Sequence, residues 1–294
     1  MPWWERWQYN ETAAYIIFFS IMFVGMAVIF GVLLYTANPE SRCTENDDSS
    51  ACLNWGRSVE RSGDLQEAER IYAMGCDLDN GKACRNQGMM AVRRDDLEAA
   101  IPPLEKGCRL ETERTCSNLA YFASDIDPGL AMWAGERSCE LGNPLGCANY
   151  AYQFLKRYVD GEEIDSDDLR ETLRYARRGC RGGSESGCYR LALAELYMKD
   201  VSAAQRAAMQ AIDLNDSHPH THKTLGLTLV LDGDVDDAMN SFADAANAEA
   251  NPGGRERYIS ERPVEERIAR RLESLRSYHP GSEAFIEEAI SRLE

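Results

Sequence analysis

The residues most able to do chemistry in this chain are its ten cysteines, which form five closely spaced pairs. Four pairs have the spacing C-x7-C, and the pair nearest the N-terminus is one residue wider. A zinc site would need spacings such as C-x2-C, which do not occur, and free thiols would not explain the constant spacing. The spacing therefore favours disulfides over these two alternatives. The pairs are Cys43 with Cys52, Cys76 with Cys84, Cys108 with Cys116, Cys139 with Cys147 and Cys180 with Cys188.

Other ionisable residues give weaker signs of chemistry. His218, His220 and His222 alternate in HPHTH and would suit a surface metal site, but Pro219 favours a turn before a helix. The aspartates of LDGDVDDA lack the spacing and the distal glutamate of a calcium loop. No GxGxxG, P-loop or HExxH motif occurs. We therefore expect no catalytic residue, no metal, no cofactor and no enzymatic activity.

An acidic insertion and one tryptophan are the candidate partner contacts. Six of the nine residues from 160 to 168 are acidic. The insertion is either a solvated loop or a docking loop for a basic partner, since insertions in repeat proteins tend to lie on a binding face. Trp133 has no counterpart in the other repeats and is the second candidate. The acidic residues are Asp160, Glu162, Glu163, Asp165, Asp167 and Asp168.

The cysteine pairs recur with a period that predicts a helical repeat. Successive second cysteines lie 32, 32, 31 and 41 residues apart, and the acidic insertion accounts for the longest interval. A small residue that lets two helices approach closely follows each second cysteine. Aromatic residues stand where the core between helices is expected. The small residues are Gly56, Gly88, Ala120, Ala151 and Ala192, and the aromatic ones are Trp55, Tyr72, Tyr121, Tyr150 and Tyr175.

The C-x7-C spacing also predicts where each pair lies. The first cysteine falls in the last turn of one helix and the second in the first turn of the next. Turn residues such as Asp79-Asn80-Gly81 and Gly142-Asn143-Pro144 lie between them. A disulfide would clamp each of these corners, and closing so short a loop contributes about 2–3 kcal/mol.

These residues resemble a known family. The pattern A-x3-Y-x3-GC-x7-C-x2-xG, present as Ala68, Tyr72, Gly75-Cys76, Cys84 and Gly88, resembles the Sel1-like repeats of the Helicobacter cysteine-rich proteins. In that family each α/α repeat carries such a disulfide, so the resemblance implies an all-α superhelical solenoid. The repeats here are shorter than is usual in that family, and alanine stands at the position equivalent to Gly88 in the later repeats.

A 34-residue period continues after the last cysteine. In residues 219–252, Leu225-Gly226, Ala238, Phe242 and Ala245 resemble a tetratricopeptide (TPR) repeat. Capping helices are expected after it, one starting near Ser260 and one from about Ser282 to Leu293. We therefore expect Sel1-like repeats over residues 36–200, TPR-like repeats over 201–252 and capping helices over 253–294.

An apolar segment precedes the repeats. Residues 12–35 carry no charge, and about 20 such residues cross the hydrocarbon core of a membrane. Trp3, Trp4 and Trp7 suit the aromatic belt at the membrane interface. A cleaved signal peptide is the alternative, but no A-x-A site follows the segment. We expect one transmembrane helix, with residues 1–11 in the cytoplasm and the disulfide-bonded part outside it.

Composition restricts the partners. The formal net charge is −17, with 49 acidic against 32 basic residues, so nucleic acid is not an expected partner. We expect a single-pass protein of a bacterial inner membrane whose periplasmic solenoid binds proteins of a membrane complex, as a scaffold or an accessory or assembly subunit. No small-molecule substrate is expected. The alternatives are an assembly factor for a respiratory complex in the mitochondrial intermembrane space and, from the resemblance, a β-lactam-binding or β-lactam-hydrolysing enzyme.

Overall fold

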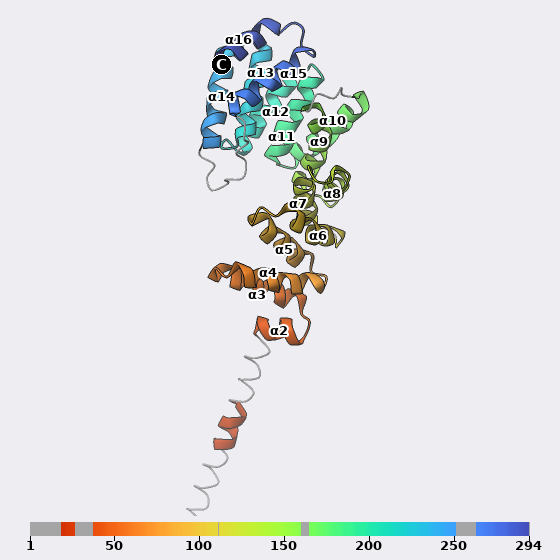
Figure 1. Ribbon diagram of the computed structural model, residues 1–294, viewed down its shortest axis with the longest axis vertical. Helices are drawn as coiled ribbons and strands as arrows, with labels where there is room; N and C mark the ends of the chain where they lie inside the picture. The colour runs from red at the N-terminus through yellow and green to blue at the C-terminus, as the bar shows by residue number, and fades with distance from the viewer. Residues whose placement is uncertain (1–18, 27–37, 111, 160–164, 251–262, 294) are drawn as a thin grey trace, which may run out of the picture. The chain divides into compact units, whose positions relative to one another are not determined.

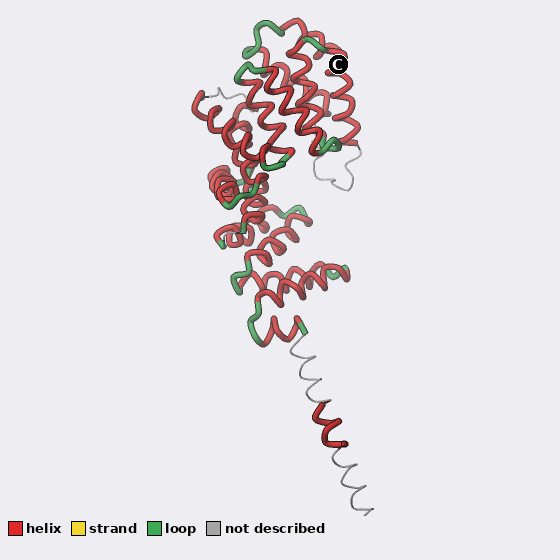
Figure 2. The backbone as a smooth tube through the Cα atoms, turned by 180° about the vertical axis from the view of Figure 1, so that it is seen from behind, coloured by secondary structure: helices red, strands yellow, loops and turns green. Residues whose placement is uncertain are grey.

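The computed structural model describes residues 19–26, 38–110, 112–159, 165–250 and 263–293, and every regular element in these ranges is an α-helix (Figures 1 and 2). Residues 19–26 form one such helix. The others are α2 (Pro39–Glu45), α3 (Ser49–Ser62), α4 (Leu65–Asp77), α5 (Gly81–Arg93), α6 (Leu97–Arg109), α7 (Glu113–Phe122), α8 (Pro128–Glu140), α9 (Pro144–Val159), α10 (Ser166–Arg181), α11 (Glu185–Tyr197), α12 (Val201–Leu214), α13 (Pro219–Asp232), α14 (Val235–Ala250), α15 (Val264–Arg276) and α16 (Glu283–Leu293). The chain divides into two compact units, residues 1–90 and 91–294.

The first unit is built around the helix pair α3/α4. Tyr72 of α4 is fully buried and its hydroxyl donates a hydrogen bond of 2.6 Å to a carboxylate oxygen of Glu60. A Cβ atom on Gly56 of α3 would lie 2.6 Å from the Tyr72 ring. The glycine that recurs in the sequence is therefore what lets the aromatic ring of the neighbouring helix reach the core.

The second unit has two layers of helices. Helices α7, α9, α11, α13 and α15 contact one another in that order, and we call them the A layer. Helices α8, α10, α12 and α14 each pack between the A-layer helices before and after them, and with α6 and α16 they form the B layer. The recurring small residues Ala120, Ala151 and Ala192 are fully buried in the A layer. The layers confirm the all-α superhelical repeat.

All ten cysteines are buried and joined in five disulfides, with the pairing that the spacing predicts. Each bridge crosses a short corner from the last turn of one helix to the first turn of the next, and the second cysteine of every pair is the fourth residue of its helix. The bridges join Cys43 to Cys52, Cys76 to Cys84, Cys108 to Cys116, Cys139 to Cys147 and Cys180 to Cys188.

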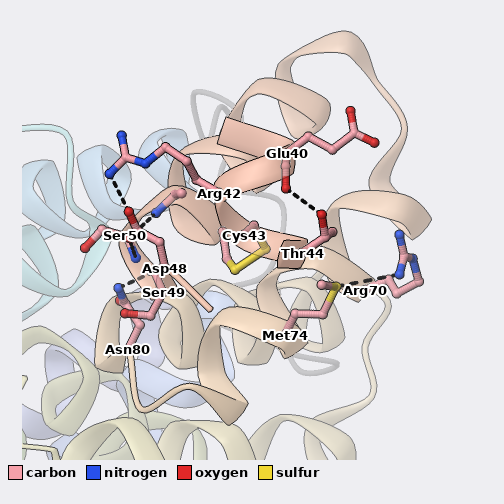
Figure 3. The surroundings of a disulfide bond; sticks show 12 residues. Glu40, Arg42, Cys43, Thr44, Asp48, Ser49, Ser50, Arg70, Met74 and Asn80 are labelled. Carbon is pink, nitrogen blue, oxygen red and sulfur yellow. Dashed lines mark hydrogen bonds and ion pairs between the residues drawn. A yellow bond between two sulfur atoms is a disulfide. The ribbon is translucent and has the colours of Figure 1, made fainter. Parts of the chain in front are cut away.

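The corner at Cys43 shows how a bridge and a helix cap act together (Figure 3). Cys52 of α3 is the bonded partner of Cys43 in α2. Asp48, just before α3, accepts hydrogen bonds from the backbone N–H groups of Ser50 and Ala51, both 3.0 Å. The same carboxylate pairs with Arg42 of α2. The capping carboxylate and the disulfide thus hold the same turn.

Two of the corners also leave too little space for side chains on both of the helices that meet there. At the α8/α9 corner Ser138 precedes Cys139, and its hydroxyl donates a hydrogen bond of 2.7 Å to the carbonyl oxygen of Glu113. A Cβ on Gly146, the residue before Cys147, would lie 2.1 Å from the Ser138 hydroxyl oxygen. At the α4/α5 corner the roles are exchanged, with Gly75 facing Ala83. One glycine at each of these two corners therefore makes room for the side chain opposite.

This packing predicts a coupled pair of substitutions. Gly146→Ala should lower the free energy of unfolding of the second unit by about 1–3 kcal/mol, because the new methyl group overlaps Ser138. Adding Ser138→Gly recreates the arrangement of the α4/α5 corner and should recover part of that loss. Urea unfolding measures both. The control is Gly129→Ala in α8, where the new Cβ would lie 3.4 Å from a carboxylate oxygen of Asp127. An unchanged unfolding midpoint for Gly146→Ala would contradict the packing.

The C-terminal helices α15 and α16 complete the second unit. Leu227, Ile268, Leu272 and Ile286 are fully buried in one cluster that joins α13, α15 and α16. Between α15 and α16, the Ser282 hydroxyl donates a hydrogen bond of 3.0 Å to the Leu231 carbonyl oxygen. Helix α16 begins one residue after the predicted start. The start predicted near Ser260 lies outside the described residues.

His279 fixes the same turn to the A layer. It is buried, and its Nε2 lies 2.7 Å from the carbonyl oxygen of Leu196. Burial, with a smaller contribution from Lys199, lowers the pKa of His279 below 6.5, although the hydrogen bond opposes this change. The folded state therefore resists protonation of His279 more than the unfolded chain does.

The sign of the pH effect follows from that difference. As the pH falls below about 6.5, the unfolded chain takes up the proton first, so His279 lowers the stability of the second unit. We expect His279→Gln, which keeps a donor, to lose less stability than the original chain between pH 7.5 and pH 5. Urea unfolding at the two pH values checks this. Equal losses in both proteins would show that His279 does not contribute.

The predicted transmembrane segment is described only in part. Among the residues that the structure describes, no helix combines the length and the apolar character that crossing a membrane requires. Only residues 19–26 of the predicted segment 12–35 are described, and Trp3, Trp4 and Trp7 lie outside the described ranges.

Candidate functional site

A row of hydrogen bonds crosses the A layer from helix to helix. Asn149 of α9 donates a hydrogen bond of 2.9 Å to the carbonyl oxygen of Ser117 in α7. Arg190 of α11 donates one of 3.0 Å to the side-chain oxygen of Asn149. One helical turn further along α9, Gln153 donates a hydrogen bond of 3.3 Å to the carbonyl oxygen of Ala120. The row therefore leads from α7 to a cation on α11.

Arg190 is a buried cation. Only 5% of its surface is exposed, and its guanidinium lies 4.9 Å from the ring centre of Tyr152 and 5.4 Å from that of Tyr189. Among the described residues no carboxylate pairs with it, and its Nε is buried without a hydrogen-bond partner. Aromatic faces stabilise such a cation in part, but a buried charge without a counter-ion remains costly.

The HPHTH segment packs beside Arg190. His218 precedes the first residue of α13, as the turn interpretation expects. Its ring stacks on Tyr189 at 5.8 Å, and the ring of His220 lies 5.6 Å from the same tyrosine. Burial, followed by repulsion from Lys223, His218, Arg267 and Arg190, lowers the pKa of His220 well below 6.5. Within the described residues no group of three metal-ligating side chains occurs.

Lys223 lies one turn further along α13 and faces two arginines of α15. Burial lowers the pKa of Lys223 to about 7, repulsion from Arg271 and Arg267 adds to this, and Glu249 opposes it. Glu249 pairs with Arg267, and Arg271 donates a hydrogen bond of 3.0 Å to the Tyr197 hydroxyl. We name this group the A-layer cationic cluster. It consists of Arg190, His218, His220, Lys223, Arg267 and Arg271.

The cluster has the composition of an anion-binding site. Among the described residues, its positive charge exceeds the single carboxylate that Glu249 supplies, in a chain whose net charge is strongly negative. Perturbed pKa values of this kind gather at functional sites, because burial and like charges are tolerated there for a ligand. These groups can hold an anion by charge and by hydrogen bonds.

This cluster was not predicted from the sequence, although one signal points to it. The second residue after the second cysteine is asparagine in four repeats and arginine in the fifth, where Arg190 follows Cys188. The fifth repeat thus differs from the other four at this position, and the residue that differs is the buried cation Arg190. The remaining members come from α13 and α15, which no local pattern connects to α11. The four asparagines are Asn54, Asn86, Asn118 and Asn149.

The predicted acidic docking loop is only partly described. Asp165 is the N-cap of α10 and accepts a hydrogen bond of 3.0 Å from the backbone of Asp167. Asp167 pairs with Arg170, and Asp168 is half-buried in the first turn of the helix. These three acids therefore have local roles at a helix N-terminus. Asp160, Glu162 and Glu163 lie outside the described residues, and a partner contact of this segment stays a prediction.

Trp133 has a neighbour that its sequence position did not indicate. It is half-buried in α8, and the guanidinium of Arg109 in α6 lies 5.0 Å from its ring centre. Its role as a partner contact also stays a prediction.

A second basic surface lies on α10. Five exposed arginines line an open groove of about 580 Å³ together with Leu173. Several are already paired, as Arg174 is with Glu171 and Arg177 is with Glu195. Their spacing places them along one stripe of the helix, which the sequence would have shown. They are Arg170, Arg174, Arg177, Arg178 and Arg181.

The two-layered array of helix pairs defines the class of fold, an α/α repeat of the Sel1 and TPR type. A crystal structure of a Sel1 repeat protein from Oxalobacter formigenes aligns with a TM-score of 0.51 and 18% identity, covering 76% of this chain and 100% of that one. The thermophilic TPR protein TTC0263 of Thermus thermophilus aligns with a TM-score of 0.50 and 15% identity, covering 65% of this chain and 97% of that one.

A larger structure is also similar. In the crystal structure of the APC/C hetero-tetramer Cut9–Hcn1, one chain aligns with a TM-score of 0.52 and 14% identity. The match covers 88% of this chain and 45% of that one, so this chain spans less than half its length. No protein-family model matches the sequence, and no curated protein matches it. At these identities the similarity establishes the fold and no function.

Proposed function

We propose that this protein is a membrane-anchored scaffold that binds other proteins outside the cytosol, as an accessory or assembly subunit of a membrane complex. The observation that carries the proposal is the set of five disulfides, one at each of five corners between consecutive helices of a repeat array. Such an array offers an extended surface built from many repeats, which suits the binding of proteins better than it suits catalysis.

The disulfides support a location outside the cytosol. Structural disulfides persist in oxidising spaces such as the bacterial periplasm and are reduced in the cytosol. All ten cysteines are paired, and eight of the ten are closed in loops of the same short spacing. We infer a periplasmic repeat domain. The mitochondrial intermembrane space, which also permits disulfides, is the alternative compartment.

The apolar character of the N-terminal segment supports the proposed membrane anchor. Residues 19–26 are helical, and their large side chains are exposed, with exposed fractions of 66% for Phe19 and 73% for Phe23. Exposed apolar side chains on a helix are stable in lipid and costly in water. We infer that residues 12–35 span the membrane once, with residues 1–11 on the cytoplasmic side.

The partner is inferred to be a protein with a basic surface. The net charge of −17 attracts a cationic surface and repels nucleic acid and other polyanions at long range. The acidic insertion is the contact we propose for that surface, and Trp133 is a second one. The acids concerned are Asp160, Glu162, Glu163, Asp165, Asp167 and Asp168.

Affinity purification tests this function. The tagged full-length chain is extracted from its own membranes in several mild detergents, and the proteins that elute with it are identified by mass spectrometry. We expect the same membrane proteins in each detergent, and less of them when Asp160, Glu162 and Glu163 are replaced by their amides. A chain that elutes alone in every detergent would contradict the role in a complex.

A further inference from the structure

The contact between α11 and the start of α13 is made by three aromatic rings. The ring centre of Tyr189 in α11 lies 5.8 Å from that of His218 and 5.6 Å from that of His220. The two histidine rings lie 5.4 Å from each other, so the three rings pack against one another. Both histidines are half-buried, and Tyr189 is buried. The contact therefore contains two titratable rings that protons from the solvent can reach.

Cations surround these rings on the two helices that carry them. Arg190 of α11 is buried, and its guanidinium lies 5.4 Å from the ring centre of Tyr189. Lys223 follows His220 by one helical turn on α13. Both cations repel a positive charge on His220. Arg190 also contacts the ring of Tyr152 in α9, and a neutral phenol does not offset the charge of the guanidinium.

The neighbouring helices α14 and α15 add more positive than negative charge. Arg267 and Arg271 of α15 face Lys223, and Arg267 also repels a charge on His220. Among the described residues, Glu249 of α14 is the carboxylate that faces this group, and it pairs with Arg267. A proton on either histidine therefore adds positive charge where the neighbouring groups already carry an excess.

We infer that the corner between α12 and α13 is an acid-sensitive element of the fold, in which protonation of His218 and His220 loosens the first turn of α13 from α11. When both rings are neutral, they pack on Tyr189. A protonated ring there loses water and is repelled by Arg190 and Lys223, and movement of the segment into solvent relieves both costs. The low pKa of His220, caused first by burial and then by Lys223, reflects the same penalty.

Two features confine the response to this corner. All ten cysteines precede it in the chain, and the last bridge joins Cys180 of α10 to Cys188 of α11, so no disulfide holds α13 to α11. Further along α13, Leu227 is fully buried in the cluster that it shares with Ile268 and Ile286, which keeps the rest of the helix in place. The response belongs to the fold of the second unit and does not depend on the proposed scaffold function.

The sign of the response follows from the two states of the corner. In the open state the histidines have their ordinary pKa of about 6.5, whereas the pKa of His220 in the closed state is lower. Below about pH 6.5 the open state therefore takes up protons first, and each titrating histidine favours opening by up to about tenfold per pH unit. Burial lowers the pKa of Lys223 to about 7, so this lysine is already largely charged at that pH and adds to the repulsion.

Hydrogen exchange of the full-length protein in detergent, measured by mass spectrometry at pH 7 and pH 5, tests the inference. After correction for the intrinsic exchange rates, the protection of the amides of residues 222–228 should fall about tenfold or more at pH 5. It should return when the sample is brought back to pH 7. The amides of α7, which contains no histidine, should keep their protection at both pH values.

Variants separate a titrating role from a structural one. The double variant His218→Gln/His220→Gln should remove the difference between the two pH values, whereas a merely structural role would lower protection equally at both. Arg190→Asn, which restores the residue of the other repeats, keeps both histidines and should reduce the difference severalfold. His222→Gln is the matched control and should keep the response, because the His222 ring contacts the carbonyl oxygen of Asp216 instead.

Three results would overturn the inference. The first is equal protection of residues 222–228 at pH 7 and pH 5, and the second is a full response in the double histidine variant. The third is a loss of protection at pH 5 that is spread evenly over all helices, which would assign the response to global unfolding. If the double variant does not fold at pH 7, Arg190→Asn decides, and an undiminished response in that variant would overturn the inference.

Discussion

Complete reduction of the disulfides under native conditions is expected to unfold the first unit while α13–α16 of the second unit stay folded. Each bridge closes a short loop and contributes about 2–3 kcal/mol, so the two bridges of the first unit together approach the stability of a small domain. The buried cluster around Tyr72 there is small, with Leu53, Ala68, Ala83 and Met90 as its other members. The cluster that joins α11–α16 contains no cysteine.

Hydrogen exchange measured by mass spectrometry, with and without reductant, checks this result. We expect the amides of α3 and α4 to lose protection on reduction and those of α13 and α15 to retain it. Replacing Cys76 and Cys84 together by alanine should reproduce part of the loss in the first unit without affecting the second. Protection of α3 and α4 that survives complete reduction would contradict the role of the bridges.

The second large effect is expected at Leu272 in α15. Leu272 is fully buried in the cluster that joins α15 and α16 to α13. Leu272→Ala removes that side chain and leaves a cavity, so the free energy of unfolding of the second unit should fall by about 2–5 kcal/mol. Leu214→Ala in α12 is the control, since Leu214 is 45% exposed and its loss should cost less than about 1 kcal/mol.

Urea unfolding followed by circular dichroism measures both variants. Exchange at the amides of α13 and α16 shows whether the loss lies in this cluster. Equal midpoints for Leu272→Ala and the original chain would mean that α15 and α16 are not integral to the unit.

Local geometry explains why the corners were predictable from the sequence. A C-x7-C spacing leaves room for one helix end, a short turn and one helix start, and the structure places Cys108 and Cys116 in those positions. The small residues were also predictable, because a helix can pack closely on the aromatic ring of a neighbouring helix only where its own side chain at the contact is small. The aromatic positions were less so: Tyr72 is fully buried, whereas Tyr121, in the last turn of α7, is 38% exposed.

The A-layer cationic cluster was not predictable in the same way. Arg190, Lys223 and Arg271 come from three helices, and only the packing of the A layer brings them together. The alternating histidines suggest a metal site, but what matters at His220 is burial next to cations, which a sequence does not display. The role of Asp165, by contrast, is a local one. It caps α10, and this could have been inferred from its position just before that helix.

Mass spectrometry of the native protein after alkylation tests the central claim most directly. Cells are quenched in acid, and the cysteines are alkylated in denaturant either before or after reduction. Five disulfides at the helix corners predict no alkylated cysteine before reduction and ten after it. Ten alkylated cysteines before reduction would contradict both the stapled repeat and its place outside the cytosol.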